Sequence, residues 1–302
     1  MTVRSMVGLG YAVAAAVLLR RTDPLVGSII VTDRCNLHCL HCSVANITRV
    51  LHPHAQLRAE MESLRADGVR VLFLYGGEPF LWRDGATHLR DLVVEAKAMG
   101  FALVNVVTNG TCPLDLPEAD LLMVSLDGGR ENHDRIRGDT YDRILRNIEA
   151  APARNICLYM AINRINQGDI EEVCETARRT SNVRAVSFNF HTPYPGTEYL
   201  RLTRAEKQDC CDRIARLMDS GYPILNLRSA FPTIVANAFG PCPQCVVVED
   251  GQRWTCGRCI DIPGLCEQCG YFFAAEYSLL FTRNPRVVMD FARTYSRHLV
   301  RR

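Results

Sequence analysis

Residues 27–42 read GSIIVTDRCNLHCLHC and join an apolar run to three closely spaced cysteines. The run GSIIVT has the length of a strand and carries no charge, which is typical of a strand buried on both faces of a parallel sheet. Cys35, Cys39 and Cys42 follow it directly. Three thiols do not pair evenly as disulfides, and a closed tetrahedral metal site needs four ligands. The loop therefore indicates a site with one open position.

The cysteines of the whole chain are clustered. The sequence has 302 residues, of which 48% are hydrophobic and 23% charged, an ordinary globular balance. Its net charge of +2 gives no sign of a nucleic-acid partner. Of the 14 cysteines, six lie between Cys242 and Cys269. Clustered thiols outside a small secreted scaffold indicate metal or iron–sulfur ligands, and we expect a reducing, cytoplasmic location.

Five more apolar runs alternate with helical patterns after the first strand. We expect strands in residues 69–77, 101–110, 120–128, 155–163 and 183–193. Helical periodicity covers 89–99 and 141–148, and capping boxes at Asp169/Glu172 and Thr203/Glu206 predict two further helices. Six βα units with right-handed crossovers predict an α/β fold, a partial (β/α)6 TIM-like barrel over residues 27–228. A small cysteine-rich C-terminal extension, 229–302, follows it.

Polar and glycine residues gather where the predicted strands end. Because ligands bind at the carboxyl ends of parallel strands, these ends should meet at one mouth. Ordinary turns also use such residues, so each position alone is weak evidence. His191 and Tyr194, after the sixth run, are candidate substrate contacts or packed residues. The other positions are Gly77 and Glu78 in GGEP, Asn109 in TNG, and Ser125 and Asp127 in SLDG.

The combination of Cys35-x3-Cys39-x2-Cys42 after the first strand and GGEP after the second resembles the radical S-adenosylmethionine (SAM) superfamily. The resemblance covers about residues 27 to 225. It implies that the three cysteines hold three irons of a [4Fe–4S] cluster and that SAM chelates the fourth. An electron from a reductase such as flavodoxin or ferredoxin would then cleave SAM to a 5′-deoxyadenosyl radical. The implied class is an oxidoreductase or a transferase.

The resemblance also implies roles for the polar positions. His41 would pack on the adenine, and Gly77 and Glu78 would meet the SAM amino group. Asn109, Ser125 and Asp127 would contact the ribose and carboxylate. The alternative is a zinc site with His38 or His41 as the fourth ligand, in a non-catalytic metal-binding protein.

The second cysteine group has the spacing Cys242-x2-Cys245-x10-Cys256-x2-Cys259-x6-Cys266-x2-Cys269. The pairs CPQC and CGRC fit zinc-ribbon knuckles. The group also resembles the auxiliary [4Fe–4S] extensions (SPASM or twitch type) of radical SAM enzymes, and CEQCGY followed by Glu276 resembles the C-terminal region of the hopanoid adenosyltransferase group. We favour the cluster over zinc. The substrate remains open between an isoprenoid lipid, a peptide and a small metabolite.

An uncharged run, SMVGLGYAVAAAVLL, precedes the first strand. At 15 residues it is shorter than the roughly 20 needed to span a bilayer. No cleavage site of small residues follows it. We expect residues 1–26 to form an apolar helix that lies at a membrane interface or at a substrate entrance; a packing helix and a membrane anchor are the alternatives.

Overall fold

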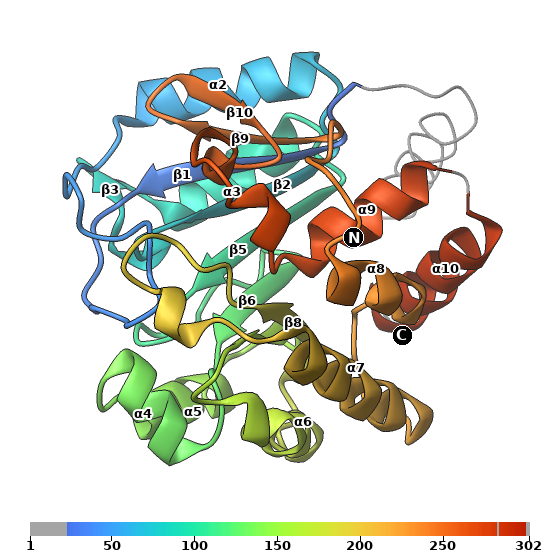
Figure 1. The fold of residues 1–302 in the computed structure, drawn as a ribbon. Coiled ribbons are helices and arrows are strands. Elements are labelled where there is room, and N and C mark those ends of the chain that lie inside the picture. Colours follow the sequence, from blue (N-terminus) through green and yellow to red (C-terminus); the bar gives the residue numbers. More distant parts are fainter. Residues whose placement is uncertain (1–22, 283, 300–302) are drawn as a thin grey trace.

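A single eight-stranded sheet forms the centre of the computed structural model, which describes residues 23–282 and 284–299 (Figure 1). The strand order is β10-β9-β1-β2-β5-β6-β7-β8. The six predicted strands are all present and run parallel to their neighbours, which confirms the partial barrel. They are β1 (Val26–Thr32), β2 (Val71–Gly76), β5 (Leu103–Thr108), β6 (Leu121–Ser125), β7 (Ile156–Ile162) and β8 (Val183–Phe190).

The cysteine-rich region adds two strands to this sheet. β9 (Cys245–Glu249) pairs in parallel with β1, with Val26 opposite Cys245. β10 (Gln252–Thr255) returns antiparallel to β9 through a turn at Asp250 and Gly251, whose φ angles are 50° and 73°. The region after residue 228 therefore continues the barrel sheet, and β1 is not an edge strand.

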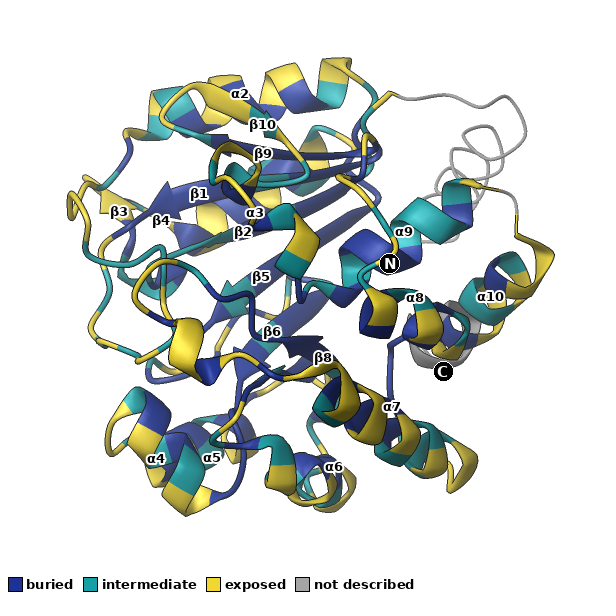
Figure 2. Ribbon diagram, viewed as in Figure 1, coloured by how far each residue is buried: buried dark blue, intermediate teal, exposed yellow. Residues whose placement is uncertain are grey.

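Helices cover the sheet with their apolar faces turned inward. Figure 2 shows buried strands and helices that are exposed on one side only. Leu57, Met61 and Leu64 of the first helix and Ile144 and Ile148 of a later one belong to the main core. These helices are α2 (His54–Ala66), α3 (Leu89–Ala98), α4 (Arg130–Arg137), α5 (Tyr141–Glu149), α6 (Ile170–Arg179) and α7 (Arg204–Asp219).

The remaining elements lie at the ends of the sheet. α8 (Phe231–Ala236), α9 (Phe272–Phe281) and α10 (Pro285–Leu299) gather beside the barrel on the right of Figure 1. A two-residue pair, β3 (Arg83–Asp84) with β4 (Thr87–His88), precedes α3.

Two sequence predictions are wrong in detail. No helix connects β5 to β6, because residues 109–120 form loops and turns that contain Pro113 and Pro117. Asp169 stands at the N-terminus of α6, but its carboxylate accepts hydrogen bonds from Gly129 N and Asn132 Nδ2, both at 2.9 Å, instead of capping the helix. The carboxylate that would cap α6 is instead used in a tertiary contact with residues 129 and 132.

The capping box of α7 is confirmed, since Thr203 Oγ1 accepts from Glu206 N at 3.2 Å and Glu206 Oε2 accepts from Thr203 N at 2.6 Å. The apolar run of residues 5–19 lies outside the described residues. Within the described part, no helix has the length and apolar character that crossing a membrane requires.

Candidate functional site

The cysteine loop rests directly on the two glycines at the end of β2. A Cβ on Gly76 would lie 2.0 Å from Thr32 O, and one on Gly77 would lie 2.3 Å from Arg34 O. Gly77 N donates to Thr32 O at 2.7 Å, and Glu78 N donates to Arg34 O at 2.9 Å. Only glycine allows this approach, so the two glycines fix where the loop starts.

Hydrogen-bond donors surround all three thiols of the loop. They come from the loop itself, from the end of β5 and from the last residue of α4. Such donors stabilise a thiolate or a metal-bound sulfur. The pairs are Leu37 N to Cys35 Sγ (3.4 Å), Asn109 Nδ2 to Cys35 Sγ (3.6 Å), Arg137 Nη1 to Cys39 Sγ (3.8 Å) and Ala45 N to Cys42 Sγ (3.4 Å).

Glu78 lies behind Gly77 with its carboxylate fully buried. Its Oε1 accepts from Thr108 Oγ1 at 2.8 Å and from Phe80 N at 3.0 Å, and its Oε2 accepts from Asn109 N at 2.7 Å. Burial raises the pKa of this carboxyl, and the hydrogen bonds oppose that shift. Glu78 thus joins the ends of β2 and β5.

Asp127, Arg137 and His41 form a buried polar cluster beside Cys39. Asp127 Oδ2 accepts from Arg137 Nε at 2.6 Å and lies 3.6 Å from His41 Nε2. Burial alone would raise the pKa of Asp127, but the Arg137 charge, together with His41, His133 and the hydrogen bond from Ala161 N, holds the pKa below its usual value. Burial lowers the pKa of His41 to about 4, so its ring is neutral at pH 7. His41 Nδ1 has no hydrogen-bond partner.

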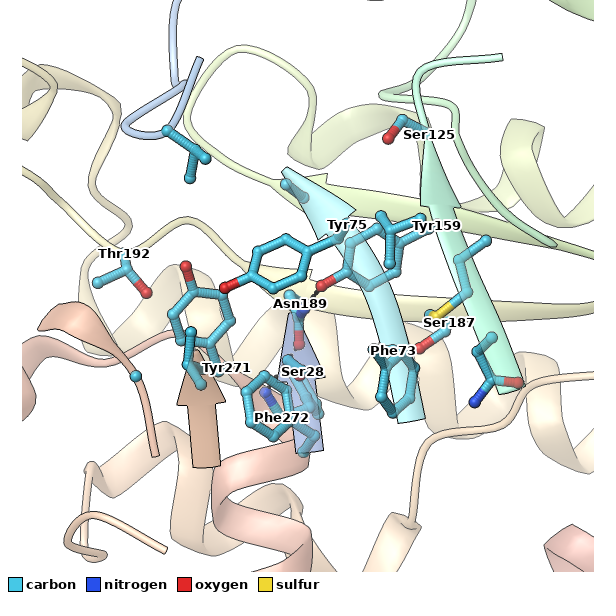
Figure 3. Close-up of a pocket in the computed structure, with 18 of the residues that line it drawn as sticks. Ser28, Phe73, Tyr75, Ser125, Tyr159, Ser187, Asn189, Thr192, Tyr271 and Phe272 are labelled. Atoms are coloured by element: carbon cyan, nitrogen blue, oxygen red, sulfur yellow. Dashed lines mark hydrogen bonds between the residues drawn. The ribbon is translucent and has the colours of Figure 1, made fainter. Parts of the chain in front are cut away.

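One cavity of about 420 Å³ connects these groups. The three cysteines, His41, Gly77, Asn109 and Ser125 line it, as do His191 and Tyr194. Glu78 and Asp127 lie behind its wall. Burial lowers the pKa of His191, whose Nε2 lies 3.0 Å from Thr197 Oγ1. Figure 3 shows Tyr75, Tyr159, Asn189 and Tyr271 grouped on the wall.

Comparison with known proteins gives this site a family. Residues 29–177 match the model of the radical SAM superfamily. The chain contains a radical SAM domain. The match includes the cysteine loop, GGEP and the ends of β5 and β6.

Relatives and solved structures agree with this family. Molybdenum cofactor biosynthesis protein 1 of Drosophila melanogaster is 29% identical over 60% of this chain and 36% of that protein. Fe-coproporphyrin III synthase of Methanosarcina barkeri is 27% identical over 64% of this chain and 52% of that protein. The chain thus spans about a third to a half of these relatives' length.

Among solved structures, SuiB of Streptococcus suis bound to precursor peptide SuiA has a similar fold. The TM-score is 0.64 at 14% identity, covering 94% of this chain and 70% of SuiB. At this identity the likeness concerns the fold alone.

The residues of the loop fit the cofactors that the radical SAM family uses, a [4Fe–4S] cluster and SAM. Sulfur is the ligand that iron–sulfur clusters take, and each sulfur here has an N–H donor nearby. Burial raises the pKa of Cys39 to about 11, so the metal itself would have to displace its proton. His38 is exposed, and His41 faces Asp127. Among the described residues, no three His, Cys, Asp or Glu side chains are placed to hold a single metal ion.

The C-terminal cysteines meet at the β9–β10 hairpin. Cys256 N donates to Cys245 O at 2.8 Å, which brings the CPQC and CGRC pairs together. Burial raises the pKa of Cys269 to about 12, with smaller contributions from the charges of Cys259, Cys256 and Cys266. Cys242 and Cys245 hydrogen-bond through their side chains. Cys256 feels the charges of Cys242, Cys259 and Cys266, so the thiols of the C-terminal group lie near one another.

Sequence analysis missed Arg137, which contacts Cys39, His41 and Asp127. It is one of three arginines in α4, and nothing in the pattern of that helix distinguishes it. Tyr75, Tyr159 and Asn189 were also missed. They alternate with core residues along apolar strands, so their inward position on a strand end was the available signal.

Proposed function

We propose that this chain is a radical SAM enzyme that cleaves SAM at a [4Fe–4S] cluster and uses the radical on a separate substrate. The observation that supports it best is the cysteine loop, with its N–H donors, opening onto the cavity that the strand ends line. When bound, the cluster and SAM would supply one-electron cleavage of the sulfonium to a 5′-deoxyadenosyl radical. Cys35, Cys39 and Cys42 would hold the cluster.

The chain's own residues would place SAM. Gly77 lines the cavity, and its carbonyl would accept from the amino group. Asn109 and Ser125 line the cavity and would bind the ribose or carboxylate, with neutral His41 beside the adenine. Because Glu78 and Asp127 are fully buried and already bonded, we assign them positioning roles.

Anaerobic reconstitution tests the proposal. Reduced protein with SAM should form 5′-deoxyadenosine, and Cys35→Ala, Cys39→Ala and Cys42→Ala should each abolish it. Cys112→Ala is the matched control, since Cys112 lies near Cys35 and Glu78 but outside the motif and should keep activity. Absence of 5′-deoxyadenosine above a no-enzyme control would contradict the proposal.

We also propose an auxiliary [4Fe–4S] cluster among Cys242, Cys245, Cys256, Cys259, Cys266 and Cys269. Their convergence at the hairpin supports a metal site, and zinc is the alternative. A variant with Cys35, Cys39 and Cys42 all changed to Ala should still show iron–sulfur absorption after reconstitution. A colourless variant that retains zinc would replace the cluster with a structural zinc site.

The substrate and the partners are the finer part of the proposal. A reductase such as flavodoxin or ferredoxin would supply the electron. The structure of SuiB contains a precursor peptide, and the names of the relatives and structures reported above mention no lipid. Contact of residues 1–26 with a membrane surface stays a prediction from the sequence.

A further inference from the structure

The cavity runs through the full depth of the partial barrel. Besides the strand ends, the first residues of β1, β2, β5 and β6 line it, namely Val26, Val71, Leu103 and Leu121. β1 has 7 residues, so the depth is roughly 20 Å at about 3.3 Å per residue. The interior of a closed barrel is normally filled by layers of large side chains. Here Ser28 and Ser187 occupy inward positions at mid-depth and leave room (Figure 3).

The deep half of the cavity is mostly apolar, apart from Glu276 of α9. Leu103, Leu121 and Leu225 line it from the barrel side. Phe273, Leu280 and Phe281 line it from α9, which lies beside the barrel in Figure 1. Burying a hydrocarbon against such walls is favourable at about 25 cal/mol per Å² of apolar surface.

Both arginines of the described lining are paired with carboxylates, and its carboxylate, Glu276, is held by hydrogen bonds. Arg137 binds Asp127, and Arg258 Nη1 binds Glu249 Oε2. Glu276 accepts from Leu227 N at 2.8 Å. A phosphate or carboxylate in this cavity would find no free cation among the described residues, and burying an unpaired charge is costly. The lining therefore favours an uncharged ligand.

Asn105 adds a polar group at mid-depth. It is 4% exposed and lines the cavity, and the structure records no hydrogen bond to its side chain from any described residue. Ser28 and Asn105 are both register partners of Phe73, on either side of it. Its amide opens onto the cavity, and a hydrocarbon that covered it would leave it without a partner, so a ligand hydroxyl or carbonyl there would gain a hydrogen bond.

We propose that the cavity binds a neutral, elongated lipid, with its hydrocarbon between the strand starts and α9 and a hydroxyl or carbonyl oxygen at Asn105. This inference rests on the proposed function in one respect only: the end of the lipid that lies at the cysteine loop is the end that would react. The depth of the cavity, its apolar walls and its lack of a free cation among the described residues favour such a lipid over a peptide or a nucleotide.

Competition with Nile red, a neutral apolar dye, tests the binding. Hexadecanol supplied from cyclodextrin should displace the dye from the reconstituted full chain. Hexadecanoate, of the same length but anionic, should compete at least about tenfold more weakly, as should GTP and an unstructured peptide. Hexadecane lacks the oxygen and should lose about fivefold, the value of one neutral hydrogen bond.

Variants locate the bound lipid. Ser187→Phe should fill the mid-depth space and weaken hexadecanol at least about tenfold, whereas Ser187→Ala keeps the space and should bind normally. Ser28→Phe makes the same test from the opposite strand if Ser187→Phe does not fold. Asn105→Leu should remove the preference for hexadecanol over hexadecane.

The binding measurements have outcomes that support or overturn the lipid proposal. Displacement by hexadecanol that both phenylalanine variants abolish supports the proposal. Unchanged binding in a folded phenylalanine variant, or stronger competition by hexadecanoate, GTP or peptide, overturns it. Binding is measured without SAM cleavage, so wild-type protein that binds hexadecanol but forms no 5′-deoxyadenosine overturns the proposed function alone. Protein that cleaves SAM but binds no lipid overturns this inference alone.

Discussion

Arg137 joins the cysteine loop to the end of β6 through a single guanidinium. It pairs with Asp127 in a place where the carboxylate is fully buried, and it donates towards Cys39 Sγ. A buried pair of this kind contributes little by its presence, but removal of one partner leaves an uncompensated charge.

Arg137→Met should therefore destabilise the fold by about 3 to 5 kcal/mol, because it leaves Asp127 charged and buried. Urea unfolding would measure the free energy. The double variant Arg137→Met/Asp127→Asn is the control and should recover part of the loss. If the single variant unfolds like the wild type, the pair has no structural importance.

His133 should make the fold sensitive to acid. Its Nδ1 accepts from Asp127 N at 3.1 Å, so the folded ring is neutral, and burial lowers its pKa from 6.5 to about 4. The unfolded chain thus takes up the proton first as pH falls. The contribution of neutral His133 to the free energy of unfolding is fully present above pH 6.5. It is lost as the pH falls towards 4, a change on the order of 3 kcal/mol.

His133→Asn keeps an oxygen that can accept from Asp127 N and has no titration in this range. Its free energy of unfolding should change less between pH 6.5 and pH 4 than that of the wild type. Equal slopes for the two proteins would rule out His133 as a source of the acid sensitivity.

At the scale of elements, contact between GGEP and the cysteine loop leads to a direct prediction. Gly77→Ala would place a methyl group 2.3 Å from Arg34 O, so the loop must move away. Reconstituted protein should bind less iron and form less 5′-deoxyadenosine. Gly240→Ala is the matched control, since nothing lies within 4 Å of its Cβ. Normal iron content in Gly77→Ala would show that the loop tolerates displacement.

The N-terminus of α7 supplies a prediction of stability only. Thr203→Ala removes the acceptor for Glu206 N and should lower the free energy of unfolding by about 1 kcal/mol. Thr203→Ser keeps the hydroxyl and should behave like the wild type. A loss of SAM cleavage in the alanine variant would contradict a purely structural role.

Helices and strands could be predicted where the hydrophobic pattern of the sequence alone determines the structure. Each of the six parallel strands is a mostly apolar run of strand length, so its type followed from the sequence. The β9–β10 hairpin also has a sequence signal, Asp250-Gly251 between two short runs, but the flanking cysteine pairs are equally typical of a metal site. Asp169 has the right residue type for a cap, yet Gly129 and Asn132, distant in sequence, bind it.

For the site, the sequence motifs located the three cysteines and the polar residues at the strand ends, because each motif directly follows a predicted strand. Arg137 and Asn105 could not be recognised, because their importance depends on neighbours from other elements. The roles of the cysteines and SAM contacts remain predictions until the cluster is measured.

For the whole molecule, the sheet extends beyond the expected boundary at residue 228. Leu25 N and Val26 N donate to Gln244 O at 2.8 and 3.0 Å, and β9 pairs along β1. A chain ending at residue 228 should therefore expose the edge of β1 and lose the wall that Val246 and Phe273 contribute to the cavity.

That truncated chain should melt at lower temperature and aggregate, as measured by circular dichroism and light scattering. The full-length variant with Cys242 and Cys245 changed to Ala is the control, since it lacks two thiols but keeps the β9 backbone. A truncated chain that is as stable as the full one would establish residues 27–228 as an independent domain.

The pairing of β1 with β9 also sets an order of events during synthesis. A ribosome releases the cysteine loop early, while the strand that flanks β1 emerges only when the chain has been made as far as Glu249. Until then the nascent chain exposes an open strand edge and three unprotected thiols, a state in which oxidation or misassembly is easiest. Chaperones that bind such edges, and reducing conditions, would matter most in that interval, and loading with iron is best placed after β9 has covered the edge of β1.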